Sequence, residues 1–211
     1  METLLLSAEH EEDFNTAIFK SAETIEKGGL VAFPTETFYG LGANIKDPNA
    51  LKKIFEVKGR ADNVPVLLLV GDMHMVEYYA SYVSKPARRI MELFWPGGVT
   101  LIFNASDAVN PVLSAGTGKI GIRYSSHPVP SAISIKLGYA ITGTSANISG
   151  KASPDSAEKT LEQLGNKIEL IIDSGLTRGI KPSTVIDVSN DNPAVVREGC
   201  ISSEAIFKVA L

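Results

Sequence analysis

The sequence predicts an α/β fold, a twisted mixed sheet with helices packed over it, and three observations support this prediction. Short apolar runs that suit strands alternate with longer segments whose apolar residues recur at helical spacing. Glycine and proline separate many of these segments. The chain has 211 residues, of which 44% are hydrophobic and 21% are charged, enough to bury a real core. We find no repeat, low-complexity tract or linker, and therefore expect a single domain over residues 1–211.

The first half of the chain begins with an amphipathic helix and a short buried strand. Pro34 cannot donate to a sheet ladder and therefore suits the end of that strand. Asp47 and Pro48 suit an N-cap and a first helical residue, and Gly59 ends the same helix. The expected elements of this half are helix 12–27, strand 30–33, helix 48–58, interior strand 65–70, helices 73–82 and 84–93, and strand 99–104.

The second half continues the alternation. Ser153 looks like a helix start, and the free amides of such a start could hold a phosphate oxygen. Arg197 alternates with valines that we expect to be buried, so its side chain should emerge on one face of the last strand. The expected elements are an irregular segment 109–114, strand 119–124, helix 129–137, strand 139–142, helix 153–164, strands 168–172, 183–188 and 194–199, and a short terminal helix.

The stretch 28–60 carries the first candidate site. A loop with the hydroxyls of Thr35 and Thr37 follows a strand, and Lys58 and Arg60 leave the end of the next helix together. This combination suits a polyanion. The alternative is that Lys58 only complements the negative end of the helix dipole and that Arg60 is solvated surface.

Two further segments offer anion-binding groups. The small residues of loop 143–150 let backbone amides approach a phosphate, and Ser145 and Asn147 can donate hydrogen bonds, although a plain hydroxyl-rich turn is the alternative. Arg123 ends a strand, where it meets either an anion or an ordinary salt-bridge partner. Because α/β sheets bind ligands beside strand ends, four cations converging there would form a central basic cavity suited to a triphosphate. These cations are Lys58, Arg60, Arg123 and Arg197.

Composition excludes several other kinds of chemistry. The three histidines are scattered, so we expect no dedicated metal site, and Cys200 is the single cysteine, expected to be a small buried hydrophobe. The fragment GTGK at 116–119 is no P-loop, because Leu113 replaces the first glycine and Ile120 the hydroxyl. No Gly-x-Ser-x-Gly elbow is present. These exclusions favour a reaction that depends on positioning and charge neutralisation.

The charge and the chain start bear on location and partners. The net charge of −4 argues against a protein that coats nucleic acid or anionic membrane, although it permits a local basic cleft. The start of the chain is too acidic for a signal peptide, and no apolar run approaches the ~18 residues of a membrane span. We therefore expect a cytoplasmic protein without membrane contact.

Five ordered motifs resemble those of the YrdC/Sua5 family, the threonylcarbamoyl-adenylate synthases, in their short single-domain form. They are FPTETFYGLG with KGR, IGIRYSSHP, TSANISG, GIKPSTVID and VVREG. The resemblance implies a YrdC-like nucleotidyltransferase that makes threonylcarbamoyl-AMP and pyrophosphate from L-threonine, bicarbonate or CO2, and ATP. It further implies that the product serves the t6A modification of tRNA, with the t6A transferase complex as a partner and direct RNA or tRNA contact left open.

The same resemblance implies roles for individual residues. ATP-binding residues would be Lys58, Arg60, Ser145, Asn147, Ser153 and Arg197. Threonine-binding residues would be Thr35, Arg123 and Ser183. Lys58 and Arg60, together with Mg2+ brought with ATP, would stabilise the charge that grows as the carbamate attacks the α-phosphate. Pro182 departs from the family pattern, which more often has an acid there.

Two alternatives stay open at this point. A non-enzymatic RNA-binding protein could use the same basic cleft, although the cations alternate with hydroxyls and lack interleaved aromatic residues for base stacking. A carbamoyl-adenylate transferase, similar to the related domain of hydrogenase-maturation proteins, would accept carbamoyl phosphate and ignore threonine.

Overall fold

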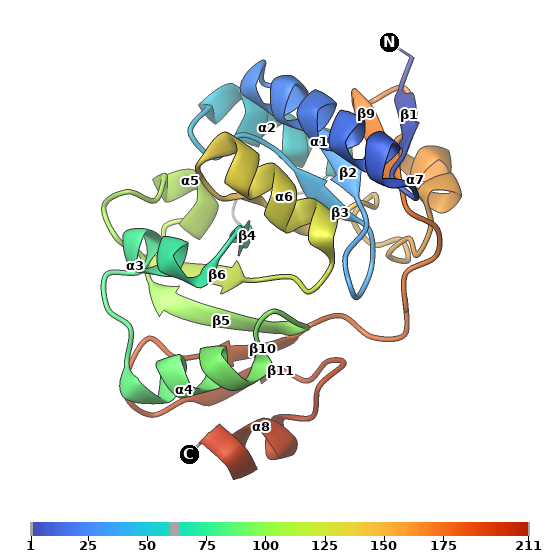
Figure 1. Cartoon of the computed structure of the whole chain (residues 1–211). Helices are drawn as coiled ribbons and strands as arrows, with labels where there is room; N and C mark the ends of the chain where they lie inside the picture. Colours follow the sequence, from blue (N-terminus) through green and yellow to red (C-terminus); the bar gives the residue numbers. More distant parts are fainter. Residues whose placement is uncertain (1, 60–63, 211) are drawn as a thin grey trace.

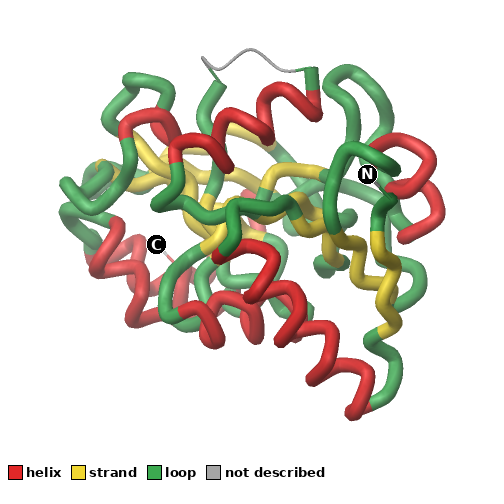
Figure 2. The backbone as a smooth tube through the Cα atoms, turned by 90° about the horizontal axis from the view of Figure 1, so that it is seen from above, coloured by secondary structure: helices red, strands yellow, loops and turns green. Residues whose placement is uncertain are grey.

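Two mixed sheets, each with parallel and antiparallel neighbours, organise the chain (Figure 1). The computed structural model describes residues 2–59 and 64–210. Within these residues one sheet has five strands and the other has six, and helices lie on their outer sides (Figure 2). The predicted α/β class is confirmed, and the strands divide between two sheets.

The first sheet has the strand order β1-β9-β2-β3-β8. β9 is parallel to β1 and β2, whereas β3 is antiparallel to β2 and β8. Because β2 ends at Phe33 and β3 begins at Gly40, the hydroxyl-rich loop 34–39 leaves this sheet at one edge. The strands are β1 (Leu4–Ser7), β2 (Val31–Phe33), β3 (Gly40–Gly42), β8 (Thr144–Ser145) and β9 (Leu170–Asp173).

The second sheet has the strand order β11-β10-β5-β6-β4-β7. β5 is parallel to β10 and antiparallel to β6, and β11 forms one edge. The strands are β4 (Leu68–Leu69), β5 (Val99–Asn104), β6 (Lys119–Arg123), β7 (Ile141–Thr142), β10 (Thr184–Asp187) and β11 (Ala194–Arg197). The arginines at the ends of β6 and β11 thus belong to one sheet.

Helices pack against both sheets and complete the cores. Phe33 of β2 lies in one buried cluster with Leu69 of β4 and Ile141 of β7, so apolar packing joins the two sheets. The helices are α1 (Glu11–Glu26), α2 (Pro48–Lys58), α3 (Val76–Tyr79), α4 (Lys85–Phe94), α5 (Pro111–Ser114), α6 (Pro128–Leu137), α7 (Ala157–Leu164) and α8 (Ser203–Ala210). Among the helices that the structure describes, none has the length and apolar character needed to cross a bilayer.

Helix α2 follows its predicted boundaries. The Asp47 side chain accepts a hydrogen bond from the Asn49 amide at 2.9 Å, and Pro48 is the first helical residue. Gly59 ends the helix in the left-handed region with φ of 58°, a conformation that glycine adopts without steric cost. These caps place Lys58 at the last residue of the helix, where its side chain is buried.

Strands β1, β3 and β8 were not predicted, strand 65–70 is shortened to β4, and three further segments differ locally from the prediction. Residues 73–82 form a 3-10 turn, Met73–Met75, and the short α3, because Ala80 takes an extended conformation and forms a β-bridge with Ala105. Residues 109–114 contain α5, which the Asn110 side chain caps. Helix α7 starts at Ala157, because Ser156 is the residue whose hydroxyl accepts from the Lys159 amide. Ser153 therefore does not lie at a helix N-terminus.

Two burial expectations for the C-terminal segment are wrong. Val195 and Val196 are 41% and 58% exposed, because β11 is an edge strand that no further strand covers. Cys200 is also exposed, although its thiol lies 3.4 Å from the carbonyl oxygen of Gly98. Partial burial, and next the Glu36 carboxylate, raise the pKa of this thiol, which argues against a reactive thiolate.

His127 makes a pH-dependent contribution to stability. Its Nδ1 accepts a hydrogen bond from the Val129 amide at 3.3 Å and caps α6. Burial lowers the pKa of His127, while the Glu36 carboxylate acts in the opposite direction. The unfolded chain binds a proton below about pH 6.5 and the folded chain only at lower pH, so acidification favours the unfolded state.

We expect the free energy of unfolding to fall as the pH is lowered from 7.5 through about 6.5. His127→Asn keeps a cap acceptor but does not titrate, so its decline should be shallower. Urea denaturation of both proteins across this range measures the difference. Identical pH dependence would show that His127 does not contribute.

Candidate active site

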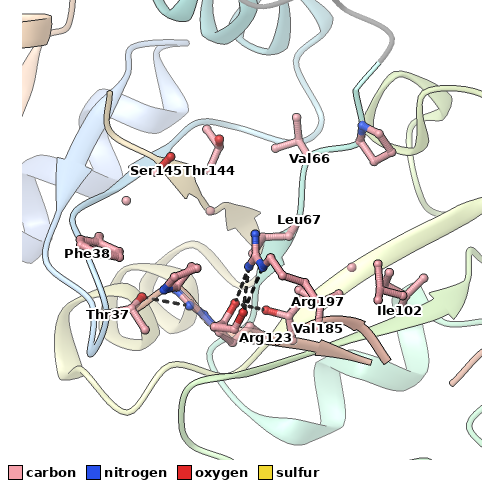
Figure 3. Close-up of a pocket in the computed structure, with 18 of the residues that line it drawn as sticks. Thr37, Phe38, Val66, Leu67, Ile102, Arg123, Thr144, Ser145, Val185 and Arg197 are labelled. Carbon is pink, nitrogen blue, oxygen red and sulfur yellow. Dashed lines mark hydrogen bonds between the residues drawn. The ribbon is translucent and has the colours of Figure 1, made fainter. Parts of the chain in front are cut away.

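One cavity of about 650 Å³, here called the site cavity, lies on a face of the second sheet (Figure 3). Alternate residues of a strand share a face, so Thr100 and Ile102 of β5 line it together with Gly121 and Arg123 of β6. Val185 and Asp187 of β10 continue the same face. Gly40, Thr144 and Ser145 of the first sheet also line the cavity. The loop residues Thr37, Phe38, Tyr39 and Ser153 lie beside them in its lining.

Gly143 allows the segment that follows β7 to pack closely against Leu67 and Leu69. A Cβ atom on this residue would lie 2.5 Å from Cγ of Leu69 and 2.8 Å from Cδ1 of Leu67, which is too close for any side chain. The Gly143 amide also donates a hydrogen bond to the Leu67 carbonyl oxygen at 3.0 Å. The glycine at the exit of β7 is therefore required by packing beside the cavity.

Arg123 is almost fully buried and lines the site cavity. Its Nη1 donates to Oγ1 of Thr37 at 3.3 Å and lies 3.5 Å from Oε1 of Glu36. Nε is buried and has no hydrogen-bond partner among the described residues. The guanidinium thus has the ordinary salt-bridge partner that was one of the two alternatives, and its residue also lines a cavity in which an anion could bind.

Ser183 and Arg197 lie next to each other at the same part of the cavity. Nη2 of Arg197 donates to the Ser183 carbonyl oxygen at 2.9 Å and to its hydroxyl at 3.3 Å, while Thr100 Oγ1 is 2.8 Å from Ser183 Oγ. Burial, and next the positive charge of Arg123, lower the pKa of Arg197. The structure therefore brings together residues that the sequence assigned to different ligands.

Lys58 is 2% exposed and holds the second predicted loop. Its Nζ donates to the carbonyl oxygens of Ser145 and Asn147, the latter at 2.8 Å, and lies 3.2 Å from Asn147 Oδ1. Ser145 Oγ donates to the same Oδ1 at 2.6 Å. Ser145 lines the site cavity, whereas Lys58 and Asn147 stand behind it. Arg60 lies outside the described residues.

Thr35 is buried behind Thr37. Its hydroxyl donates to the Phe38 carbonyl oxygen at 2.6 Å and accepts from the Thr37 amide at 3.2 Å. It is Thr37 that lines the site cavity, while Thr35 lines a second groove. The structure thus places the predicted hydroxyl loop at the site but exchanges which threonine reaches the cavity.

The sequence reasoning missed two further cavity residues, Lys119 and Asp187. Lys119 Nζ lies 2.7 Å from Asp187 Oδ2. Burial acts to raise the pKa of Asp187, but hydrogen bonds from Lys119 and Ser189 outweigh it, so the pKa lies below its ordinary value. Lys119 stands two and four residues before Gly121 and Arg123 on one strand, a spacing that could have placed it on the same face.

The charges of the cavity favour an anionic ligand. The described lining residues include Lys119, Arg123 and Arg197 but a single carboxylate, that of Asp187. Because buried cations attract anions strongly in a site of low dielectric, this excess favours phosphates or carboxylates. The fold is an α/β fold, and the described residues that line its site cavity carry more positive than negative charge.

The family model Sua5_yciO_yrdC, described as "Telomere recombination", matches residues 23–199. The chain belongs to the Sua5/YciO/YrdC family, as its motifs predicted. It is 41% identical to a threonylcarbamoyl-AMP synthase from Pyrococcus abyssi over 90% of this chain and 56% of that protein. It is 39% identical to a threonylcarbamoyl-AMP synthase from Bacillus subtilis, over 91% of this chain and 56% of that protein.

Two solved structures are similar along nearly the whole chain. P. abyssi Sua5 complexed with L-threonine has a TM-score of 0.92 at 38% identity, covering 99% of this chain and 61% of that one. Escherichia coli YciO has a TM-score of 0.85 at 30% identity and is covered over 98% of both chains. The chain therefore spans little more than half the length of the curated synthases above.

Proposed function

We propose that this protein is an L-threonylcarbamoyladenylate synthase, which makes threonylcarbamoyl-AMP and pyrophosphate from L-threonine, bicarbonate or CO2, and ATP. One observation carries the proposal. Arg123, Ser183 and Arg197 line the same cavity as Ser145, whose loop is held by Lys58. A carboxylate and a phosphate chain can thus be bound next to each other. The similarity to a Sua5 complexed with L-threonine supports the amino acid side of this proposal.

In the proposed reaction the residues of the chain mainly position the reactants. Arg123 binds the threonine carboxylate through its unused N–H groups, with Ser183 and Thr37 beside it. The threonine amine and bicarbonate form a carbamate with loss of water, and its oxygen attacks the α-phosphate of ATP, so that pyrophosphate leaves. Bringing these groups together in one cavity would remove much of the entropic cost of their encounter.

Charge stabilisation is assigned to the cations and the second loop. The Ser145 hydroxyl, Arg197 and, outside the described residues, Arg60 would face the phosphates, with Ser153 on the same wall. Lys58 would act through the loop that it holds and through its charge. Mg2+ brought with ATP would neutralise phosphate charge. Since Asp187 is engaged by Lys119, the phosphates themselves would hold that ion.

The proposed partners and location follow the same assignment. The proposed adenylate has to be passed on to an acceptor, and we assign the role of receiving it to the t6A transferase complex that modifies tRNA. We place the reaction in the cytoplasm, where ATP and tRNA are available.

Pyrophosphate release tests the proposal. The purified protein with ATP and Mg2+ should release pyrophosphate only when both L-threonine and bicarbonate are present, and mass spectrometry should detect threonylcarbamoyl-AMP. Release that is unchanged when threonine is omitted would contradict the proposal. Release that needs carbamoyl phosphate instead would favour the carbamoyl-adenylate transferase. Salt-sensitive RNA binding without any threonine-dependent chemistry would favour the RNA-binding protein.

A further inference from the structure

Glu36 approaches Arg123 from behind the site cavity. The two side chains are 15% and 6% exposed, and Nη1 of Arg123 lies 3.5 Å from Oε1 of Glu36. Glu36 lines the second groove, of about 990 Å³, and Arg123 lines the site cavity. Thr37 lines both, so Glu36, Thr37 and Arg123 form the wall between the two hollows.

Glu36 is itself held in place. Its Oε2 accepts a hydrogen bond from the buried hydroxyl of Ser125, and that hydroxyl accepts from the His127 amide at 3.2 Å. One carboxylate oxygen is thus fixed by the start of α6, and the other is directed at the guanidinium. Ordinary ion pairs on a protein surface are exposed and loosely held, whereas the Glu36 carboxylate is largely buried and bound on both sides.

The pair leaves hydrogen-bonding capacity unused. Oε1 of Glu36 and Nε of Arg123 are both buried without a hydrogen-bond partner among the described residues. Buried polar groups are normally satisfied, so such groups call for an explanation. Contacts of catalytic groups are often long before the ligand binds and shorten in the complex.

The local charges point the same way. The positive charge of Arg123 lowers the pKa of Arg197, and Glu36 pairs with Arg123. The pairing with Glu36 thus allows Arg123 and Arg197 to lie close together at the cavity.

We propose that Glu36 is a positioning residue, which holds the Arg123 guanidinium against the wall so that its unused N–H groups face the carboxylate of the bound amino acid. This inference rests on the proposed function. Glu36 does not touch the substrate, and acts only through Arg123. It would therefore contribute to binding of the carboxylate and not to binding of the rest of the amino acid.

A chemical double-mutant cycle tests the inference. One change is Glu36→Gln, which removes the charge but keeps the size. The other is the replacement of L-threonine by L-threoninamide, which lacks the carboxylate. Dissociation constants are measured by calorimetry with a non-hydrolysable ATP analogue, and KM values by pyrophosphate release.

In the wild type, L-threonine should bind more tightly than L-threoninamide. In Glu36→Gln this preference should fall roughly tenfold, because the charge-assisted contact of Arg123 loses its orientation. The KM for ATP should stay within about twofold of the wild type, because the substitution changes none of the residues assigned to ATP binding. Ser125→Ala should change the preference in the same direction by less.

Glu77→Gln is the matched control. Glu77 also pairs with an arginine, Arg88, at 2.8 Å, but both side chains are more than half exposed and lie outside the two hollows. This variant should keep the wild-type preference. If Glu36→Gln fails to fold by circular dichroism, Ser125→Ala alone carries the test.

The outcomes separate the inference from the proposed function. If Glu36→Gln weakens L-threonine and L-threoninamide by the same factor, Glu36 is not a positioning residue, and the proposed function is unaffected. If the wild type releases pyrophosphate without threonine and L-threonine does not bind, the proposed function is overturned and this inference with it. If L-threonine binds but does not react, the ratio of dissociation constants still decides the role of Glu36.

Discussion

Lys58→Met should lower the rate of threonine-dependent pyrophosphate release by roughly 100-fold, comparable to removal of a preorganised hydrogen-bond donor from an active site. Methionine has a similar length but donates no hydrogen bond. The carbonyl oxygens of Ser145 and Asn147 would lose the donor they share, and the loop that lines the site cavity would relax. Initial rates at saturating ATP and threonine measure the effect.

Lys52→Met is the matched control for this experiment. Lys52 lies on the same helix, but its side chain is 77% exposed and pairs with Glu56 at 3.7 Å. It should retain activity and stability close to the wild type, as expected for a surface ion pair. Activity of Lys58→Met within about threefold of the wild type would contradict the assigned role of Lys58.

Arg123→Ala should raise the KM for L-threonine by roughly 100-fold, about 2.8 kcal/mol, because a buried carboxylate ligand would lose its charged partner. Arg123→Lys keeps the charge without the two parallel donors and should give an intermediate increase of about tenfold. Steady-state kinetics with threonine as the varied substrate measure both values.

Stability must be followed in parallel, because Arg123→Ala leaves the Glu36 carboxylate buried without its cation. Arg123→Lys avoids this cost and keeps the test valid if the alanine variant unfolds. Arg88→Ala, which removes an exposed arginine from its pair with Glu77, is the matched control and should leave KM unchanged. A threonine KM that does not change in Arg123→Lys would remove Arg123 from the amino acid site.

Local signals in the sequence predicted much of the secondary structure. Asp47, Pro48 and Gly59 define α2 because capping acts within one helical turn and needs no information about the rest of the fold. Strand β5 was also predicted and observed at 99–104, because an apolar run is likewise a local signal. The helix predicted at 73–82 was wrong in its extent, because a tertiary contact, the β-bridge between Ala80 and Ala105, ends it early.

The division into two sheets could not be predicted in this way. Pairing depends on contacts between strands far apart in the chain, such as β1 with β9 and β5 with β10. A pattern of alternating strands and helices gives the class but not which strands become neighbours.

The candidate site was predicted better than the position of each side chain within it. Arg123, Ser183 and Arg197 line one cavity, as their motifs led us to expect. Which of Thr35 and Thr37 lines that cavity depends on the exact course of loop 34–39, and the sequence does not fix it. The burial of Lys58 behind Ser145 likewise follows from packing of α2 against the second loop.

The central claim is that one cavity binds the amino acid carboxylate at Arg123 and the nucleotide phosphates beside it. A crystal structure of the protein with L-threonine and a non-hydrolysable ATP analogue tests this claim most directly. The account predicts the threonine carboxylate within hydrogen-bond distance of Arg123 and the phosphates in the same cavity near Ser145 and Arg197. Ligands bound instead in the second groove, near Arg178 and Lys181, with Arg123 and Arg197 touching neither, would contradict it.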